Sequence, residues 1–349
     1  MTDRKKCKTT KIIISIVVIC LIIGAISGFT AYSLFLKPIN SELTAKSIYI
    51  DSDDTIDSLY FKIEEQIKSP TPKGFKLISK YKQLEKQIRT GHYQIDSTDN
   101  SYTLFIKFSR GHQKPVKLII NNIRTLEQLA SQVDDQLMID SLSLINHLHN
   151  QDNITTLGYT KETLPALFIP NTYEVYWNMS VTDFIQRMER EHNLFWNEER
   201  TKKADLIGFT PIEIATIASI VEEETNAKSE QPTVAGLYIN RLKRGMLLQA
   251  DPTIKFAHQD FTMKRILNKD LEIDSPYNTY KNTGLPPGPI RFASINGLNS
   301  VLNYEEHNYL YMCAKEDFSG LHNFATNLSE HMRNARKYWQ ALNRLKIYN

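Results

Sequence analysis

The stretch Ala218-Ser-Ile-Val-Glu-Glu-Glu-Thr225 is predicted to be the end of a helix that carries three consecutive carboxylates. Upstream, Thr210-Pro-Ile-Glu213 has the pattern of a capping box with proline at the first helical position, so we expect the helix to begin there. A rotation of about 100° per residue then points Glu223 to water and places Glu222 and Glu224 on either side of a buried apolar stripe. The stripe comprises Ile214, Ile217, Ala218 and Val221.

A carboxylate at the border of an apolar stripe is partly desolvated, and the negative end of the helix dipole lies close by; both effects raise its pKa. A general acid that works near neutral pH needs this environment. Helix geometry therefore favours Glu222 or Glu224 as an acid and does not choose between them. The alternative is an acidic, solvated helix end without a catalytic role.

Three later segments follow this helix in a fixed order. They are Gly236-Leu-Tyr-Ile-Asn-Arg-Leu-Lys-Arg-Gly-Met-Leu-Leu-Gln-Ala-Asp-Pro-Thr253, Ser275-Pro-Tyr-Asn-Thr-Tyr280 and Gly284-Leu-Pro-Pro-Gly-Pro-Ile290. Together with the helix, they resemble the YceG-like family of endolytic murein transglycosylases over roughly the C-terminal half of the chain. The catalytic glutamate of that family directly precedes Thr in a Glu-x-Glu-Thr signature, so the resemblance assigns this role to Glu224.

The N-terminus predicts a membrane anchor. Residues 12–36 form an uncharged stretch of 25 residues, which is long enough to cross about 30 Å of hydrocarbon. Residues 1–11 contain five Lys or Arg and one Asp, a net charge of +4, which favours a cytoplasmic tail under the positive-inside rule. A cleaved signal peptide is the alternative, but the stretch is long for one and no clear cleavage site follows it. We expect a single-pass anchor in the cytoplasmic (inner) membrane, with the catalytic domain in the periplasm.

Charge and cysteine content argue against a nucleic-acid partner, an intrachain disulfide and a metal site. The whole chain carries +3 and the tail +4, so the remainder sums to about −1, which argues against a nucleic-acid partner. Outside the tail and the apolar stretch, Cys313 is the one remaining cysteine, so no intrachain disulfide is expected there; it is predicted to be a buried core residue. No Cys/His cluster has metal-ligand spacing, and neither a metal nor a cofactor is expected.

The expected fold class is α+β. Residues 37–124 are interpreted as a small α+β module, with strands at 47–50, 91–95 and 102–107 and a helix over 54–67. The segments 55–67 and 125–137 match at most apolar and every acidic position, which predicts a repeated strand–helix unit. The first copy resembles a LysM-type glycan-binding module; the alternative is a scaffold that holds the catalytic domain off the membrane. A mostly helical connector is expected over 125–169.

The catalytic domain is expected over 170–349, with mixed α+β structure. One long helix is predicted over 181–200 and another over 231–244. A short helix is predicted to start with Asp251 as its N-cap. The segment 277–289 is too rich in proline and glycine for regular structure. Its aromatic and amide side chains are of the kinds that stack on sugar rings and bond to sugar hydroxyls.

Several further residues are candidates for contact with substrate, each beside a structural alternative. Arg241 is as easily the partner of a neighbouring carboxylate, and Asp251 is more simply a helix cap. His322 resembles a position in a family strand and is expected to be a structural hydrogen-bond partner. The full set of candidate substrate-binding residues is Glu222, Asn240, Arg241, Gln249, Asp251, Tyr277, Asn278 and Tyr280.

The resemblance implies an endolytic cut of the bond between N-acetylmuramic acid (MurNAc) and N-acetylglucosamine (GlcNAc) in nascent peptidoglycan strands, leaving 1,6-anhydro ends. It also implies glycan strands and the membrane as partners, with peptidoglycan synthases and divisome or elongasome proteins as further candidates. Two other functions remain open. A hydrolytic muramidase needs a second carboxylate, for which Asp251 and Glu222 are the candidates. A non-catalytic, membrane-tethered glycan-binding scaffold needs no catalytic carboxylate.

Overall fold

The computed structural model describes residues 2–40 and 42–345 of the chain. The described residues form two compact units. The first comprises the chain up to Val116 together with Glu174–Asn178, and the second comprises Lys117–Tyr173 and the chain from Met179 onward. The first boundary between the two units lies after Val116, and the connector expected over 125–169 belongs to the second unit.

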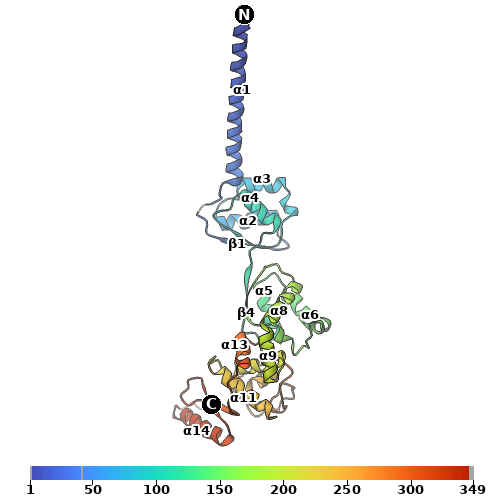
Figure 1. Cartoon of the computed structure of the whole chain (residues 1–349), viewed down its shortest axis with the longest axis vertical. Helices are drawn as coiled ribbons and strands as arrows, with labels where there is room; N and C mark the ends of the chain where they lie inside the picture. Colours follow the sequence, from blue (N-terminus) through green and yellow to red (C-terminus); the bar gives the residue numbers. More distant parts are fainter. Residues whose placement is uncertain (1, 41, 346–349) are drawn as a thin grey trace. The chain divides into compact units, whose positions relative to one another are not determined.

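The first unit begins with a long apolar helix. Helix α1 (Thr2–Ala31) continues directly into a π-helical segment, η1 (Tyr32–Leu36), and Figure 1 shows it as an extended rod above the rest of the unit. Residues Lys11–Leu36 are long and apolar enough to cross a membrane, and none of the most apolar window is buried in the protein. An N-terminal helix of this kind is either a membrane span or a signal sequence.

The rest of the first unit is a strand–helix–helix–strand module followed by one more helix. Strands β1 (Lys46–Ile50) and β2 (Gly91–Ile95) pair antiparallel, from Lys46 opposite Ile95 to Ile50 opposite Gly91. Between them lie α2 (Ile56–Ile67), α3 (Lys73–Tyr81) and the 3₁₀ turn η2 (Leu84–Lys86). Helix α4 (Ser101–Arg110) follows β2. The core of the unit is built from fully buried side chains of both strands and these helices, among them Ile50, Leu59, Phe75, Tyr93 and Phe108.

The strand predicted over 102–107 is wrong, because this segment lies within α4. The Asn100 side chain accepts hydrogen bonds from the backbone N–H groups of Tyr102 and Thr103, and Thr103 bonds back to the backbone of Asn100. This capping box satisfies the first free N–H groups of a helix. It overrides the preference of the β-branched and aromatic residues for a strand.

The predicted repeat of a strand–helix unit is confirmed. Strand β3 (Val116–Ile120) lies 70 residues after β1, and Thr55 and Thr125 are the N-caps of α2 and α5 (Leu126–Asp134). Helix α6 (Ser141–His149), the short α7 (Gln151–Thr156), a 3₁₀ turn η3 (Leu164–Leu167) and strand β4 (Asn171–Val175) complete the second copy. Strands β3 and β4 form a two-stranded sheet.

The second unit is built around α10 (Pro211–Glu224). Thr210 and Glu213 form the predicted capping box. The predicted apolar stripe is wider than expected, since every residue from Ile214 to Val221 is buried. A helix that is apolar all round belongs in a core. Helix α10 packs against α9 (Glu198–Ile207), α11 (Gln231–Lys243), α12 (Asp251–His258) and α13 (Ile295–Leu302).

Around this core, α8 (Val181–Phe195) and α9 replace the single helix predicted over 181–200. The break occurs because Asn197 caps a new helix by accepting from the N–H of Arg200. The segment 277–289 contains no helix or strand, as predicted. The 3₁₀ turn η4 (Asp270–Glu272) precedes this segment. Helix α13 is followed by the antiparallel strands β5 (Tyr311–Ala314) and β6 (His322–Ala325) and by helix α14 (Leu328–Arg344).

Candidate active site

Glu224 is the last residue of the buried helix α10, and its carboxyl group enters a polar cavity. The Tyr238 hydroxyl, presented by α11, donates a hydrogen bond to Glu224 Oε1 over 2.6 Å. This bond fixes one carboxyl oxygen, so Oε2 is the oxygen that remains to carry a proton. The two side chains meet because α10 and α11 pack against each other.

Burial raises the pKa of the Glu224 carboxyl to about 7. The Tyr238 hydrogen bond opposes this shift because it stabilises the carboxylate, whereas the negative charge of Asp251 adds to it. The positive charges of Lys255 and Arg241 lower the pKa by smaller amounts. Glu224 is therefore mostly protonated below neutral pH and about half protonated near pH 7, so the acid form that a general acid requires is available.

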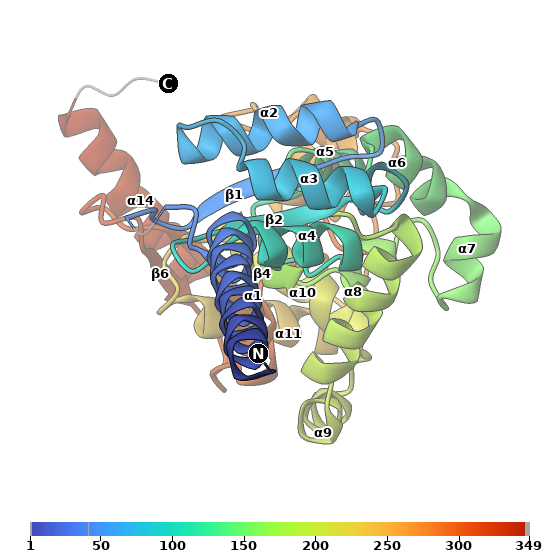
Figure 2. The ribbon, with the colours of Figure 1, turned by 90° about the horizontal axis from the view of Figure 1, so that it is seen from above.

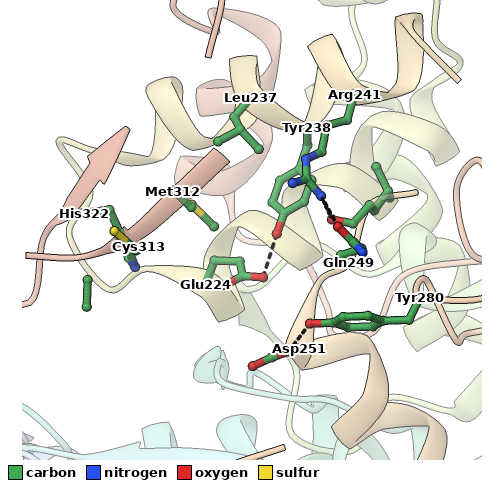
Figure 3. Close-up of a pocket in the computed structure, with 12 residues that line it drawn as sticks. Glu224, Leu237, Tyr238, Arg241, Gln249, Asp251, Tyr280, Met312, Cys313 and His322 are labelled. Atoms are coloured by element: carbon green, nitrogen blue, oxygen red, sulfur yellow. Dashed lines mark hydrogen bonds between the residues drawn. The ribbon is translucent and has the colours of Figure 1, made fainter. Parts of the chain in front are cut away.

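The cavity has a volume of about 250 Å³ and lies between α10, α11, the start of α12, the loop that carries Tyr280, and strands β5 and β6. Figure 3 shows Glu224 facing Tyr238, and Asp251 and Tyr280 together on another side. Apart from Glu224, it is lined by Leu237, Tyr238, Arg241, Leu248, Gln249, Asp251, Tyr280, Met312, Cys313, Ala314 and His322. A wall of hydroxyl, amide, carboxyl and guanidinium groups suits a ligand rich in hydroxyl groups.

Four of the candidate substrate-binding residues line this cavity: Arg241, Gln249, Asp251 and Tyr280. Asp251 is not the predicted N-cap of α12, because Ala250 holds that position and Asp251 is the first helical residue. Its carboxylate instead accepts a hydrogen bond from the hydroxyl of Tyr280. Asp251 and Tyr280 therefore act as one hydrogen-bonded pair on the cavity wall.

The other four candidates have structural partners away from the cavity. Glu222 accepts hydrogen bonds from the backbone N–H and the hydroxyl of Ser294, and it packs on Gly297, where a Cβ atom would collide with it. Asn240 donates to the backbone oxygens of His307 and Tyr309. Asn278 is fully buried and donates to the backbone oxygens of Leu271 and Ile273, whereas the Tyr277 ring packs on Phe256.

Glu223 does not point to water, contrary to the prediction. Its carboxylate lies between two arginines, with Arg124 Nε 3.1 Å from Oε1 and Arg291 Nη1 2.9 Å from the same oxygen. Arg124 comes from the connection between β3 and α5 and Arg291 from the loop before α13, so sequence spacing gives no sign of either contact. Glu223 therefore ties three segments of the second unit together instead of forming a free surface charge.

The residues that line the cavity without having been candidates for substrate binding include two with polar rings, Tyr238 and His322. Tyr238 lies three residues before Arg241, on the same face of α11, and this spacing was the one available signal. His322 faces the cavity while Nδ1 is 2.8 Å from Oε2 of the buried Glu230, and the backbone N–H of His322 donates to Glu230 Oε1. The expected structural role for His322 thus holds, but the ring also forms part of the cavity wall. Cys313 lines the cavity and is only partly buried, so its predicted place in the core is wrong.

Arg241 is a buried support of the site. Its Nε donates to the backbone oxygen of Leu310 over 2.6 Å, and Nη1 donates to the backbone oxygens of Leu247 and Leu248 over 3.1 and 2.8 Å. Nη1 also lies 3.4 Å from Gln249 Oε1, so the guanidinium links α11, the residue just before strand β5 and the segment that precedes α12. Among the residues that the structure describes, no carboxylate forms an ion pair with Arg241, which was the alternative considered from the sequence.

Replacing Arg241 by Ala is expected to lower the free energy of unfolding by on the order of 3 kcal/mol, because the three backbone oxygens lose their donor. Lys, which lacks the planar fork, should recover only part of this loss. Urea unfolding followed by circular dichroism measures the effect. Arg244, exposed at the end of the same helix, is the matched control, and Arg244→Ala should change stability by less than about 0.5 kcal/mol. An equal decrease in the free energy of unfolding for Arg241→Ala and Arg244→Ala would contradict the supporting role of Arg241.

Comparisons with known proteins identify the family of the chain. The pattern of the YceG-like family matches residues 48–337. An endolytic murein transglycosylase of Bacillus subtilis is 30% identical over 344 residues, which covers 93% of this chain and 92% of the relative. One of Streptococcus pneumoniae is 27% identical over 76% of this chain, but this match spans only 53% of the streptococcal protein. The chain belongs to the YceG-like family.

A solved structure supports the fold. The crystal structure of a yceG-like protein from Listeria monocytogenes aligns with 83% of this chain and 98% of its own, with a TM-score of 0.56 and 24% sequence identity. The α+β fold of this chain is thus shared with a solved protein.

Proposed function

We propose that this protein is an endolytic lytic transglycosylase that cleaves the MurNAc–GlcNAc bond of nascent peptidoglycan strands. The observation that carries the proposal is Glu224, a carboxyl group with a pKa of about 7 that opens into a polar cavity. The names of the B. subtilis and S. pneumoniae relatives support the same reaction.

In the first step of the proposed reaction, protonated Glu224 donates its proton to the glycosidic oxygen, and the bond from that oxygen to the muramic acid C1 breaks. An oxocarbenium-like centre develops at C1. The Tyr238 hydroxyl, 2.6 Å from Oε1, stabilises the carboxylate that this step creates. The proton therefore leaves an acid that is neutral in the resting state and well supported once it is charged.

In the second step, the Glu224 carboxylate takes the proton of the muramic acid C6 hydroxyl while O6 attacks C1. The product is a 1,6-anhydro ring, Glu224 is protonated again, and no water is consumed. An intramolecular nucleophile has a high effective concentration, so no nucleophilic side chain is required. The Asp251–Tyr280 pair, Gln249 and Arg241 on the cavity wall are the groups that we assign to holding the sugar.

We further propose that residues 12–36 anchor the protein in the cytoplasmic membrane, with residues 1–11 in the cytoplasm and the rest of the chain on the other side. The length of the apolar helix and the basic tail support this topology. The order β1–α2–α3–β2 supports a LysM-like, glycan-binding role for the first unit. Cleavage beside the membrane would release new strands from the enzymes that polymerise them, which makes peptidoglycan synthases candidate partners.

The Tyr238 hydrogen bond leads to a prediction about pH dependence. Tyr238→Phe removes a donor that stabilises the Glu224 carboxylate, so the pKa of Glu224 should rise from about 7 to a higher value. Because the acid must be protonated, the fall in kcat/KM on the basic side should move to higher pH in the variant. Rates of soluble glycan release between pH 5 and 9 measure this shift. A basic limb that stays in place, or moves to lower pH, would show that Tyr238 does not act on the acid.

A further inference from the structure

Helix α3 lies directly beside the foot of the apolar helix. Gly74, in its first turn, packs on the backbone of Leu34 in η1, and a Cβ atom at position 74 would overlap the Leu34 carbonyl oxygen. The same Cβ would lie 2.9 Å from the hydroxyl of Ser101, the first residue of α4. Only glycine permits this approach, so α3 and the start of α4 are held at the level where the apolar helix ends.

The face of α3 that points away from the core is both apolar and basic. Leu77 is 55% exposed and Tyr81 is 79% exposed, and the two lie one turn apart. At about 100° per residue they lie between Gly74, which touches the apolar helix, and the exposed Lys73 on the far side. Exposed leucine and tyrosine side chains beside lysines are the composition of a helix that lies in a membrane interface.

The orientation of α3 fits the same environment. Helix α1 is seen lengthwise in Figure 1 and close to end-on in Figure 2, whereas α3 is seen lengthwise in both, so the two helices cross steeply. When α1 crosses a bilayer, α3 therefore runs along its surface. Tyr102, 47% exposed in the first turn of α4, adds a second aromatic side chain near this level. Tyrosine is enriched at the membrane–water boundary, because its ring is apolar and its hydroxyl remains hydrated.

We propose that α3 is an interfacial helix that docks the first unit onto the outer surface of the cytoplasmic membrane. Leu77 and Tyr81 enter the boundary between headgroups and acyl chains, and exposed lysines bind anionic lipid headgroups. Two observations select a lipid surface as the partner: the patch is continuous with the apolar helix through Gly74 and Leu34, and its charge complements anionic lipid. The lysines are Lys73, Lys80 and Lys82. The proposal rests on the membrane anchoring proposed above.

The docking has a consequence for the first unit. A module joined to a membrane span by its chain alone can tilt freely, whereas one with a second contact at the surface has a fixed orientation. Interfacial contact through α3 would fix which face of the module is presented to newly made glycan. The control surface is α2, whose Phe61 is 68% exposed on another helix of the same unit.

The test uses the full-length chain in nanodiscs that contain phosphatidylglycerol. Cys7, Cys20 and Cys313 are replaced by Ser, and one cysteine is introduced by Leu77→Cys, Tyr81→Cys or, as the control, Phe61→Cys. Each is labelled with an environment-sensitive fluorophore, which is then quenched by headgroup spin-labelled lipid or by aqueous iodide. We expect several-fold stronger quenching by the lipid at positions 77 and 81 than at 61, and the reverse order with iodide. Equal iodide quenching at all three positions would overturn the proposal.

A second arm tests the charges. The combined substitution of Lys73, Lys80 and Lys82 by Glu should reduce lipid quenching at position 77 at least twofold, as should discs of phosphatidylcholine alone. Unchanged quenching in both cases would overturn the role of anionic headgroups. A chain that does not enter the discs would refute the anchor itself, whereas a chain that enters with position 77 exposed to iodide would refute only the interfacial helix.

Discussion

Glu224→Gln is expected to lower the rate of glycan cleavage by on the order of 10²-fold or more. Gln has the size of Glu and still accepts the hydrogen bond from Tyr238, but it has no proton to donate. The variant thus removes the general acid and leaves the cavity intact. Release of soluble muropeptides from uncrosslinked glycan, quantified over time by liquid chromatography and mass spectrometry, measures the loss. Wild-type turnover in a folded Glu224→Gln protein would refute the assignment.

Glu223→Gln is the matched control, because it makes the same chemical change one residue earlier on the same helix. Glu223 binds Arg124 and Arg291 and does not line the cavity, so its loss should leave turnover within a few-fold of wild type. The Glu223→Gln protein should instead be less stable, since two arginines lose their carboxylate partner. Equal losses of activity in the two variants would mean that the helix end as a whole, and not Glu224, is required.

The pH dependence of stability distinguishes a lost acid from a damaged fold. The pKa of Glu224 is about 7 in the folded protein against an ordinary value of 4.5, so the folded state binds the proton more tightly than the unfolded chain does. The ionised carboxyl therefore destabilises the fold, fully above pH 7 and not at all well below pH 4.5. Glu224→Gln should accordingly raise the Tm at pH 8 by several degrees and change it little near pH 4.5. A lower Tm at pH 8 would indicate misfolding.

The elements that depend on local sequence were the most predictable. The capping box at Thr210 fixed the start of α10, and the 70-residue repeat identified matching helices at Thr55 and Thr125. The error over 102–107 was also local, since Asn100 and Thr103 carry a capping pattern that competes with the apparent strand. Short side-chain-to-backbone bonds of this kind decide between helix and strand when the apolar pattern permits both.

Contacts between distant segments were beyond prediction from the residues alone. Helix periodicity limited the acid to Glu222 or Glu224, but their environments differ because of Ser294 and Tyr238, which lie 72 and 14 residues away. Glu223 was assigned to water by the same periodicity, and two distant arginines bury it. A helical pattern gives the direction of a side chain relative to its own helix, whereas its partner depends on how the helices pack.

The chemical form of the product distinguishes a transglycosylase from a muramidase. Both enzymes cut the same bond, but only the muramidase consumes water. We expect every new muramic acid end to be the 1,6-anhydro form, lighter by one water than the hydrolysis product and resistant to borohydride reduction. A hydrolase of the usual kind needs a second carboxylate beside the acid. Glu222 is held by Ser294 outside the cavity, which leaves Asp251 as the carboxylate that shares the cavity with Glu224.

Asp251→Asn separates the two mechanisms. The charge of Asp251 raises the pKa of Glu224, so its removal should lower that pKa and move the basic limb of the pH profile to lower pH. Near pH 6, where the acid remains mostly protonated, the variant should still turn over and still produce anhydro ends, because O6 of the substrate is the nucleophile. Reducible ends from the wild-type enzyme, together with an Asp251→Asn variant that is inactive at every pH, would instead make Asp251 the second catalytic carboxylate of a hydrolase.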